Sequence, residues 1–81
     1  MTILLFGITR DIVGGPAIEV PEDKTTSISS VEKLKQFVFG QFPALKELSS
    51  IAVAVNNEYA NDNTPLRNTD EIALIPPVSG G

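Results

Sequence analysis

The sequence predicts an α+β fold, in which a mixed sheet of four to five strands carries one main helix on one face. Three observations support this prediction. Apolar runs typical of strands stand near both ends of the chain, one long amphipathic segment lies between them, and 81 residues suffice for a single domain. We therefore expect two layers, with strands from both ends of the chain joined in one sheet.

The N-terminal part predicts two strands joined by a turn. Residues 2–9 (TILLFGIT) are rich in β-branched and aromatic side chains, as strands are. Residues 17–20 (AIEV) alternate apolar and polar side chains, which indicates a half-buried strand. Between them, Gly14, Gly15 and Pro16 are typical of a turn. These features predict an N-terminal hairpin.

The long amphipathic segment predicts the main helix. Residues 21–30 are polar and loop-like, and Ser29 with Glu32 fits the capping box that starts a helix. Apolar residues then recur at spacings of three and four, forming a stripe of Val31, Leu34, Val38 and Phe42, widened by Phe37. Pro43 ends the helix because proline lacks a backbone N–H, and residues 44–48 can add a short helical turn.

The next segment predicts a second pair of strands. Residues 51–55 (IAVAV) form a strand with larger apolar side chains on one face and alanines on the other. Asn56 and Asn57 tolerate positive φ and suit a tight turn. Residues 58–60 therefore return as a short strand.

The last strand and the tail define the expected organisation of the chain. Residues 61–69 form a loop that Leu66 anchors, and residues 70–75 (DEIALI) form the last strand. Two prolines end this strand because neither can donate a hydrogen bond to a sheet. We therefore expect a compact domain at residues 1–75 and an extended tail at residues 76–81.

Composition excludes most enzyme chemistry. The chain has no cysteine and no histidine, so it lacks a thiolate nucleophile, the side chains of most zinc sites and the commonest general base. Its net charge of −4 repels nucleic acid and favours a partner that presents basic groups. The N-terminal apolar run is too short to span a bilayer, and no basic residue precedes it. We therefore expect a cytoplasmic protein without a membrane partner.

Few side chains are candidates for catalysis. The acidic pairs at residues 22–23 and 70–71 are interpreted as solvated surface charge, since nothing nearby predicts burial or a raised pKa. The paired glycines of the first turn fit no phosphate-binding motif. Arg10 and Arg67 stand alone rather than in a basic patch. The sequence therefore predicts no catalytic residue in this chain.

The first and last predicted strands are apolar on both faces. Both alternating sets of side chains are apolar in residues 2–9, and residues 70–75 behave similarly. Such strands are expected where helices cover both faces of a sheet, but this chain has only one long helix. We therefore expect an exposed apolar patch on the second face, of the kind that binds a partner. The alternative is that loops cover it.

The C-terminal sequence, ALIPPVSGG, predicts an arm that leaves the domain. Adjacent prolines favour a stiff, polyproline-like exit, and residues 78–81 reach about 13 Å when extended at about 3.3 Å per residue. Gly80 and Gly81 have no Cβ, so this tip can enter a narrow channel. Fraying or a cloning linker is the alternative; otherwise the terminal carboxylate is the working group.

The tail and the segment before it are similar to a known family. DEIALIPPVSGG, preceded by AVAVNNEYANDNTPLRNT, resembles the C-terminal half of the small subunit of molybdopterin synthase. Residues 10–14 (RDIVG) match the R-[ED]-[LI]-V-G segment of the same family. These proteins are sulfur carriers of molybdenum cofactor biosynthesis. The resemblance covers essentially the whole chain and implies a ubiquitin-like β-grasp fold.

The resemblance also implies a function for the terminal carboxylate. In this family, an adenylating enzyme of the ubiquitin-activating type uses ATP to convert the terminal carboxylate to an acyl-adenylate. A sulfur donor then replaces AMP and leaves a thiocarboxylate. The tail inserts into the large subunit, which holds the catalytic groups, and sulfur passes to cyclic pyranopterin monophosphate to form molybdopterin. The implied synthase contains two small and two large subunits, and the small subunit binds no cofactor or metal of its own.

The same resemblance implies roles for individual residues. Gly81 carries the sulfur as a thiocarboxylate, and Gly80 gives clearance. The reach of the inserted tail is set by Pro76, Pro77, Val78 and Ser79. Contacts with the large subunit and the activating enzyme are expected at Phe6, Tyr59 and Ile75.

Other functions remain open as alternatives. The sulfur carrier of thiamin biosynthesis shares the fold, tail and activation chemistry, but such carriers are usually shorter and lack PPV before the glycines. A ubiquitin-like modifier would use the same terminus to form isopeptide bonds with lysines. A plain interaction module would not need the last two glycines. An iron–sulfur β-grasp protein is excluded, because the chain has no cysteine to hold a cluster.

Overall fold

The computed structural model describes residues 1–48 and 51–76, in which one five-stranded mixed sheet forms the framework. The strand order is β2-β1-β5-β3-β4; the central strands β1 and β5 run parallel, and all other neighbours pair antiparallel. Along the chain the strands are β1 (Thr2–Leu5), β2 (Ala17–Glu19), β3 (Ala52–Val55), β4 (Glu58–Ala60) and β5 (Ile72–Ile75).

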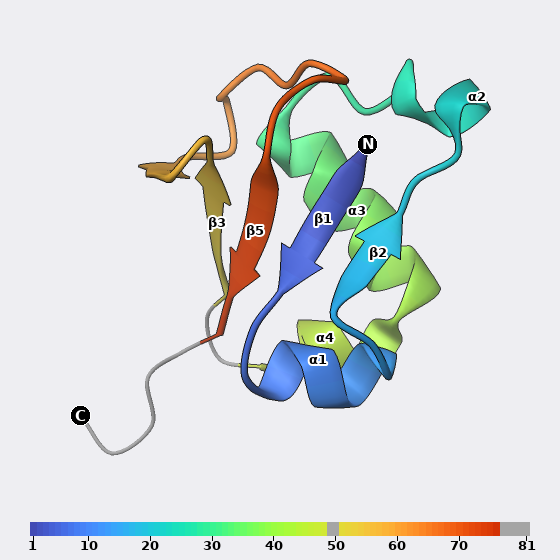
Figure 1. The fold of residues 1–81 in the computed structure, drawn as a ribbon, viewed down its shortest axis with the longest axis vertical. Helices are drawn as coiled ribbons and strands as arrows, with labels where there is room; N and C mark the ends of the chain where they lie inside the picture. The colour runs from blue at the N-terminus through green and yellow to red at the C-terminus, as the bar shows by residue number, and fades with distance from the viewer. Residues whose placement is uncertain (49–50, 77–81) are drawn as a thin grey trace.

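One long helix packs on one face of this sheet. α3 (Val31–Gln41) lies behind the sheet in Figure 1, while α1 (Ile8–Val13) and α4 (Pro43–Lys46) lie at the end where β1 and β5 finish. The one-turn α2 (Glu22–Thr25) follows β2. Within the described ranges, no helix lies in front of the sheet. This is the predicted two-layer α+β architecture.

The hydrophobic core lies between α3 and the sheet. The predicted stripe of α3 is confirmed at its three central positions, since Val31, Leu34 and Val38 are buried. The buried side chains that face them from the three central strands are Ile3, Leu5, Val53, Ile72 and Leu74. Leu66, in the loop before β5, is also buried, which confirms the predicted anchor.

The predicted strand over residues 2–9 is wrong beyond Leu5. The chain turns at Gly7, where φ is 56°, and α1 follows. The β-branched side chains of this segment favour a strand by local propensity. Tertiary packing overrides that preference, because Thr9 is completely buried and Ile12 packs against the core.

The predicted glycine turn begins only after α1. Gly14, with a φ of 91°, ends the helix and donates its N–H to the carbonyl oxygen of Arg10 at 2.7 Å. β1 and β2 then pair antiparallel, with Ile3 opposite Ile18. The two N-terminal strands are therefore confirmed as a pair, but a helix connects them rather than a tight hairpin turn.

The start of α3 is also different from the prediction. Its N-cap is Ser30, whose hydroxyl oxygen accepts the N–H of Lys33 at 3.4 Å. Ser29 and Glu32 therefore do not form the predicted capping box. The cause is tertiary, because the carbonyl oxygen of Ser29 accepts the N–H of Leu66 at 2.9 Å, outside the helix.

The loop before β5 completes the cap of α3. The backbone N–H groups of Val31 and Glu32 donate to the carbonyl oxygens of Thr64 and Asp62, each at 3.0 Å. The Asp62 carboxylate also pairs with the ammonium of Lys35 at 2.8 Å. Free N–H groups in the first turn of a helix need such partners, and a distant segment of the chain supplies them here.

The C-terminal half follows the prediction more closely. Asn56 and Asn57 have φ values of 52° and 67°, so the predicted tight turn is confirmed. It joins β3 to β4, with Ala54 opposite Tyr59. In the N-terminal half, residues 21–30 were predicted to form a loop. This prediction is wrong in part, because the segment contains the one-turn helix α2.

Candidate docking face and tail exit

The sheet face opposite α3 carries an apolar row that crosses all five strands. Cross-strand pairing places these residues side by side in the order Ala17, Leu4, Ala73, Ala54 and Tyr59. Leu4 and the three alanines are half-buried, and the Tyr59 side chain is 77% exposed. No described helix covers this row (Figure 1). The predicted apolar patch on the second face is therefore present, as a flat strip that ends at Tyr59.

The three predicted contact residues lie in two places on the molecule. Phe6 follows β1 and is 46% exposed, and the half-buried Ile75 ends β5. Because β1 and β5 are parallel, with Leu5 opposite Leu74, the next residues of both strands reach the same end of the sheet. Tyr59 lies apart from them on the edge strand β4, where it ends the apolar row opposite Ala17.

Ile8 is a further candidate contact residue. It begins α1, directly after Gly7, and its side chain is 47% exposed. The sequence placed it in one of the two apolar sets of the predicted first strand, whereas the structure exposes it on a helix. With Phe6 two residues earlier, Ile8 extends the exposed apolar surface round the end of β1.

A buried threonine fixes the turn between β1 and α1. The Thr9 hydroxyl accepts the backbone N–H of Phe6 at 3.0 Å and donates to the carbonyl oxygen of the same residue. The Thr9 N–H also donates to this carbonyl oxygen, at 3.2 Å. Both backbone polar groups of Phe6 are therefore hydrogen-bonded to Thr9. These bonds fix the position of the Phe6 backbone, and with it the point from which its side chain projects. No sequence signal pointed to this contact.

The tail begins against this turn. Pro76, the first residue after β5, is half-buried. A Cβ added at Gly7 would lie 3.1 Å from Cγ of the Pro76 ring. The remaining tail positions, Pro77, Val78, Ser79, Gly80 and Gly81, lie outside the described residues. Their predicted roles, and the predicted division between domain and tail, stay predictions.

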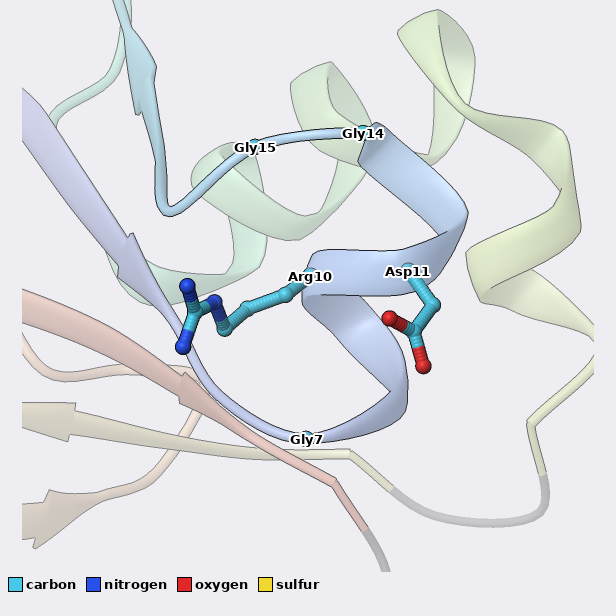
Figure 2. Close-up of a pocket in the computed structure, with 5 residues that line it drawn as sticks. All are labelled: Gly7, Arg10, Asp11, Gly14 and Gly15. Carbon is cyan, nitrogen blue, oxygen red and sulfur yellow. The ribbon is translucent and has the colours of Figure 1, made fainter.

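An open hollow of about 570 Å³ lies beside α1. Figure 2 shows its lining, with Gly7 at one side and Gly14 and Gly15 at the other. The Arg10 side chain extends toward the strands, whereas Asp11 lies on the other side of the hollow (Figure 2). No ion pair joins them, since the one salt bridge among the described residues is elsewhere. The hollow contains no arrangement of groups that indicates catalysis.

The acidic pairs are also structural or solvated. Residues 22–23 are exposed. The Asp70 carboxylate accepts the N–H of Arg67 at 2.8 Å and the side-chain amide of Asn56 at 3.1 Å. These hydrogen bonds, the one from Arg67 first, lower the pKa of Asp70 below its ordinary value. A general acid must carry a proton, so a carboxyl group that is held in its ionised form cannot serve as one.

The described residues include neither a metal-binding cluster nor a membrane-spanning helix. No group of three or more acidic, histidine or cysteine side chains is placed to hold a metal ion within residues 1–48 and 51–76. Over the same ranges, no helix is both long and apolar enough to cross a bilayer. The expectation that the chain binds no cofactor stays a prediction.

Comparison with known proteins identifies the family. The model of the ThiS family matches residues 3–81. The chain belongs to the ThiS family. A molybdopterin synthase sulfur carrier subunit from Dictyostelium discoideum is 39% identical, in an alignment that covers 98% of this chain and 93% of that protein. The family resemblance seen in the sequence is therefore confirmed.

Solved structures give the same fold for this ThiS family member. The crystal structure of the small archaeal modifier protein SAMP1 from Haloferax volcanii has a TM-score of 0.78 and 28% identity, covering 99% of this chain and 97% of that one. A complex of subunits 1 and 2 of the molybdopterin-converting factor from Helicobacter pylori contains a chain with a TM-score of 0.62 and 27% identity, covering 99% and 96%. The ubiquitin-like β-grasp fold is confirmed.

Proposed function

We propose that this chain is the sulfur carrier subunit of a molybdopterin synthase. The observation that carries the proposal is its 39% identity, over nearly the full length of both chains, to a protein with that function. The reactive group is then the terminal carboxylate of Gly81.

The proposed chemistry takes place at one carbonyl carbon. A carboxylate is ionised at neutral pH and is a poor electrophile. An adenylating enzyme of the ubiquitin-activating type joins a carboxylate oxygen of Gly81 to the α-phosphorus of ATP, and pyrophosphate leaves. A sulfur nucleophile then attacks the carbonyl carbon, AMP leaves with the bridging oxygen, and a thiocarboxylate remains. ATP is a substrate of the activating enzyme and not a cofactor of this chain.

Transfer to the pterin takes place inside the large subunit. The thiocarboxylate sulfur replaces an oxygen substituent on a carbon of cyclic pyranopterin monophosphate, so that a C–S bond forms as a C–O bond breaks, and hydrolysis of the acyl–sulfur bond returns the carboxylate. The dithiolene of the product needs two sulfur atoms, so two loaded carriers react for each molybdopterin. We propose a synthase of two small and two large subunits in the cytoplasm. Residues 76–81 form the inserted tail.

The apolar row and the end of β1 supply the docking surface in this proposal. Exposed apolar surface of this kind marks partner sites. Tyr59 ends the apolar row, while Phe6 and Ile75 lie where β1 and β5 finish. The Helicobacter pylori complex contains two subunits of a molybdopterin-converting factor, one of which has this fold. Similar docking is proposed for the large subunit and, in an earlier step, for the adenylating enzyme.

The first test follows the carboxyl group directly. The purified chain is incubated with its adenylating enzyme, ATP and a sulfur source, and its intact mass is recorded. We expect one oxygen to be replaced by sulfur in the full chain, and no change in a variant that lacks Gly80 and Gly81. A full chain that never acquires sulfur contradicts the carrier function.

The second test identifies the pathway. The thiocarboxylated chain is mixed with the large synthase subunit and cyclic pyranopterin monophosphate, and the dithiolene product is measured. We expect product from this mixture and none from the unmodified chain. If the loaded chain gives no product here but supplies sulfur for thiazole synthesis, it is the thiamin carrier instead.

A protein modifier is the second candidate, because of the likeness to the archaeal modifier SAMP1. Activation would be the same, but a lysine amine would attack the acyl-adenylate or a derived thioester and form an isopeptide bond. The test is mass spectrometry of cell proteins for the C-terminal residues of this chain attached to lysine. Such conjugates, present with the wild type and absent with the Gly80-Gly81 deletion, would support the modifier function.

A further inference from the structure

Gly7 and Pro76 meet where the two central strands end. β1 and β5 are parallel, with Leu5 opposite Leu74, so Gly7 and Pro76 each lie two residues beyond a paired position. The Pro76 ring occupies the space beside Gly7, because a Cβ there would come within 3.1 Å of its Cγ atom. Such a distance is too short for a relaxed carbon–carbon contact. The missing side chain of Gly7 therefore admits the first residue of the tail.

The turn that makes this contact is rigid. Gly7 adopts a φ of 56° with a ψ of −133°, a backbone conformation that costs little only for glycine. Phe6, immediately before it, is held at both backbone polar groups by the buried Thr9 hydroxyl. The Arg10 N–H donates to the carbonyl oxygen of Gly7 at 3.1 Å. The surface against which Pro76 rests therefore has a fixed position relative to Phe6.

We propose that Gly7 is a positioning residue that sets the direction in which the tail leaves the sheet. It acts through Pro76, whose ring occupies the space that a side chain at position 7 would enter, so that this contact fixes where the tail begins. This inference rests on the proposed function, since a set direction matters only if the end of the tail must reach a particular atom. A misplacement of about 1 Å at a reacting centre can lower a rate by about a hundredfold.

The chain contains a second glycine with positive φ that serves as a control. Gly14 lies at the other end of α1 and has a φ of 91° with a ψ of 21°, in the left-handed helical region. A Cβ added there would meet nothing within 4 Å. Gly14→Ala therefore strains the backbone without pushing on Pro76, whereas Gly7→Ala does both and, at its ψ of −133°, strains the backbone more. Thermal unfolding of both variants measures the strain of each, and a Pro76→Ala background isolates the contact with the ring.

The first readout is the rate of sulfur transfer, measured separately from the affinity for the large subunit. The thiocarboxylate is installed by thiolysis of an intein fusion, so that activation does not affect the result. We expect Gly7→Ala to lower the single-turnover transfer rate at saturating large subunit about tenfold relative to Gly14→Ala. The Kd for the large subunit should stay within about twofold of the Gly14→Ala value, because the docking face is retained.

The second readout tests the contact itself by a double-mutant cycle. Pro76→Ala removes the Cγ atom that an alanine at position 7 would strike. In a Pro76→Ala background, Gly7→Ala should therefore lower the transfer rate much less than it does with Pro76 present, because only its backbone strain remains. If Gly7→Ala remains about tenfold slower in that background, the effect does not pass through Pro76 and the proposal is wrong.

The third readout needs no partner. The chain has no cysteine, so Ser79→Cys in the tail and Gln36→Cys on the exposed side of α3 give two unique sites for nitroxide labels. We expect the distance distribution between the labels to shift in Gly7→Ala and to match the wild type in Gly14→Ala. Identical distributions in all three proteins would overturn the proposal.

The outcomes separate this proposal from the proposed function. If the labels shift but the wild-type chain transfers no sulfur to the pterin, the carrier function fails and the role of Gly7 stands. If the wild type transfers sulfur and Gly7→Ala matches Gly14→Ala in every readout, the function stands and Gly7 has no positioning role.

Discussion

The two faces of the sheet are both apolar, but they differ in the size of their side chains. The face under α3 presents branched residues, among them Ile3, Leu5, Ile72 and Leu74, and all of these are buried. The open face presents Leu4 and three alanines, which are half-buried. Large side chains fill the space below the helix, whereas small ones leave a flat surface. The first face therefore stabilises the fold, and the second is available to a partner.

Two isoleucines on β5 give the sharpest test of this difference. Ile72 is completely buried on the covered face, whereas Ile75 is half-buried at the end of the strand. We expect Ile72→Ala to lower the free energy of unfolding by about 3 kcal/mol, and Ile75→Ala by less than about 1 kcal/mol. Urea unfolding of both variants measures the difference. Equal losses would mean that the open face also stabilises the fold.

Tyr59 tests the open face as a binding surface. Its side chain is 77% exposed, so Tyr59→Ala should change the free energy of unfolding by less than about 0.5 kcal/mol. Loss of an aromatic contact should weaken binding of the large subunit by about 2 kcal/mol, roughly thirtyfold in Kd. Titration calorimetry measures the Kd, with Glu58→Ala, at the exposed neighbouring position, as the control. Similar Kd values for the two variants would remove the docking role of Tyr59.

Two buried threonines provide the next comparison. Thr9 bonds to both backbone polar groups of Phe6, whereas the Thr25 hydroxyl only donates to the carbonyl oxygen of Pro21, at 3.1 Å. Thr9→Val leaves the Phe6 N–H without that partner, so it should lower the free energy of unfolding by about 1 to 2 kcal/mol. It should also weaken docking, while Thr25→Val should leave docking unchanged. Thr9→Ser should restore both properties, and failure of this rescue would point to lost packing instead.

The smallest expected effect concerns the pH dependence of stability. The pKa of Asp70 is lowered from its ordinary 3.8 by the hydrogen bonds from Arg67 and Asn56. The folded chain therefore holds this proton less tightly than the unfolded chain. The stabilisation is fully present above that ordinary value and is lost as the pH falls through the lower pKa of the folded chain. Asp70→Asn should flatten the loss of stability in acid. Urea unfolding at several pH values checks this, with exposed Asp23→Asn as the control.

The sequence predicted the features that depend on periodicity or on short turn motifs. The stripe of α3 follows from spacings of three and four, and its central members Val31, Leu34 and Val38 are buried. The turn at Asn56 and Asn57 follows from the tolerance of asparagine for positive φ. Both signals are local, so the rest of the fold did not change them.

The features that the sequence did not predict depend on distant contacts. α1 forms where β-branched residues favour a strand, because Thr9 is buried in the folded domain. The N-cap of α3 moves to Ser30 because a loop more than thirty residues later supplies the remaining bonds to the first turn. The position of Ile8 on a helix and the contact between Gly7 and Pro76 have the same origin. The sequence therefore predicted the apolar surface and the tail of the candidate site. It did not predict the turn between β1 and α1, where the two meet.

The position of β5 has a consequence for the synthesis of this protein. β5 pairs with both β1 and β3, so a nascent chain that stops before Ile72 lacks the middle of its sheet. Such a truncated product exposes its core residues and becomes a substrate for proteases and chaperones. A chain that has completed Ile75 lacks only the few residues that carry the reactive carboxylate in the proposed function. If the proposed function holds, premature termination therefore yields few folded chains that dock on the partner without the reactive carboxylate.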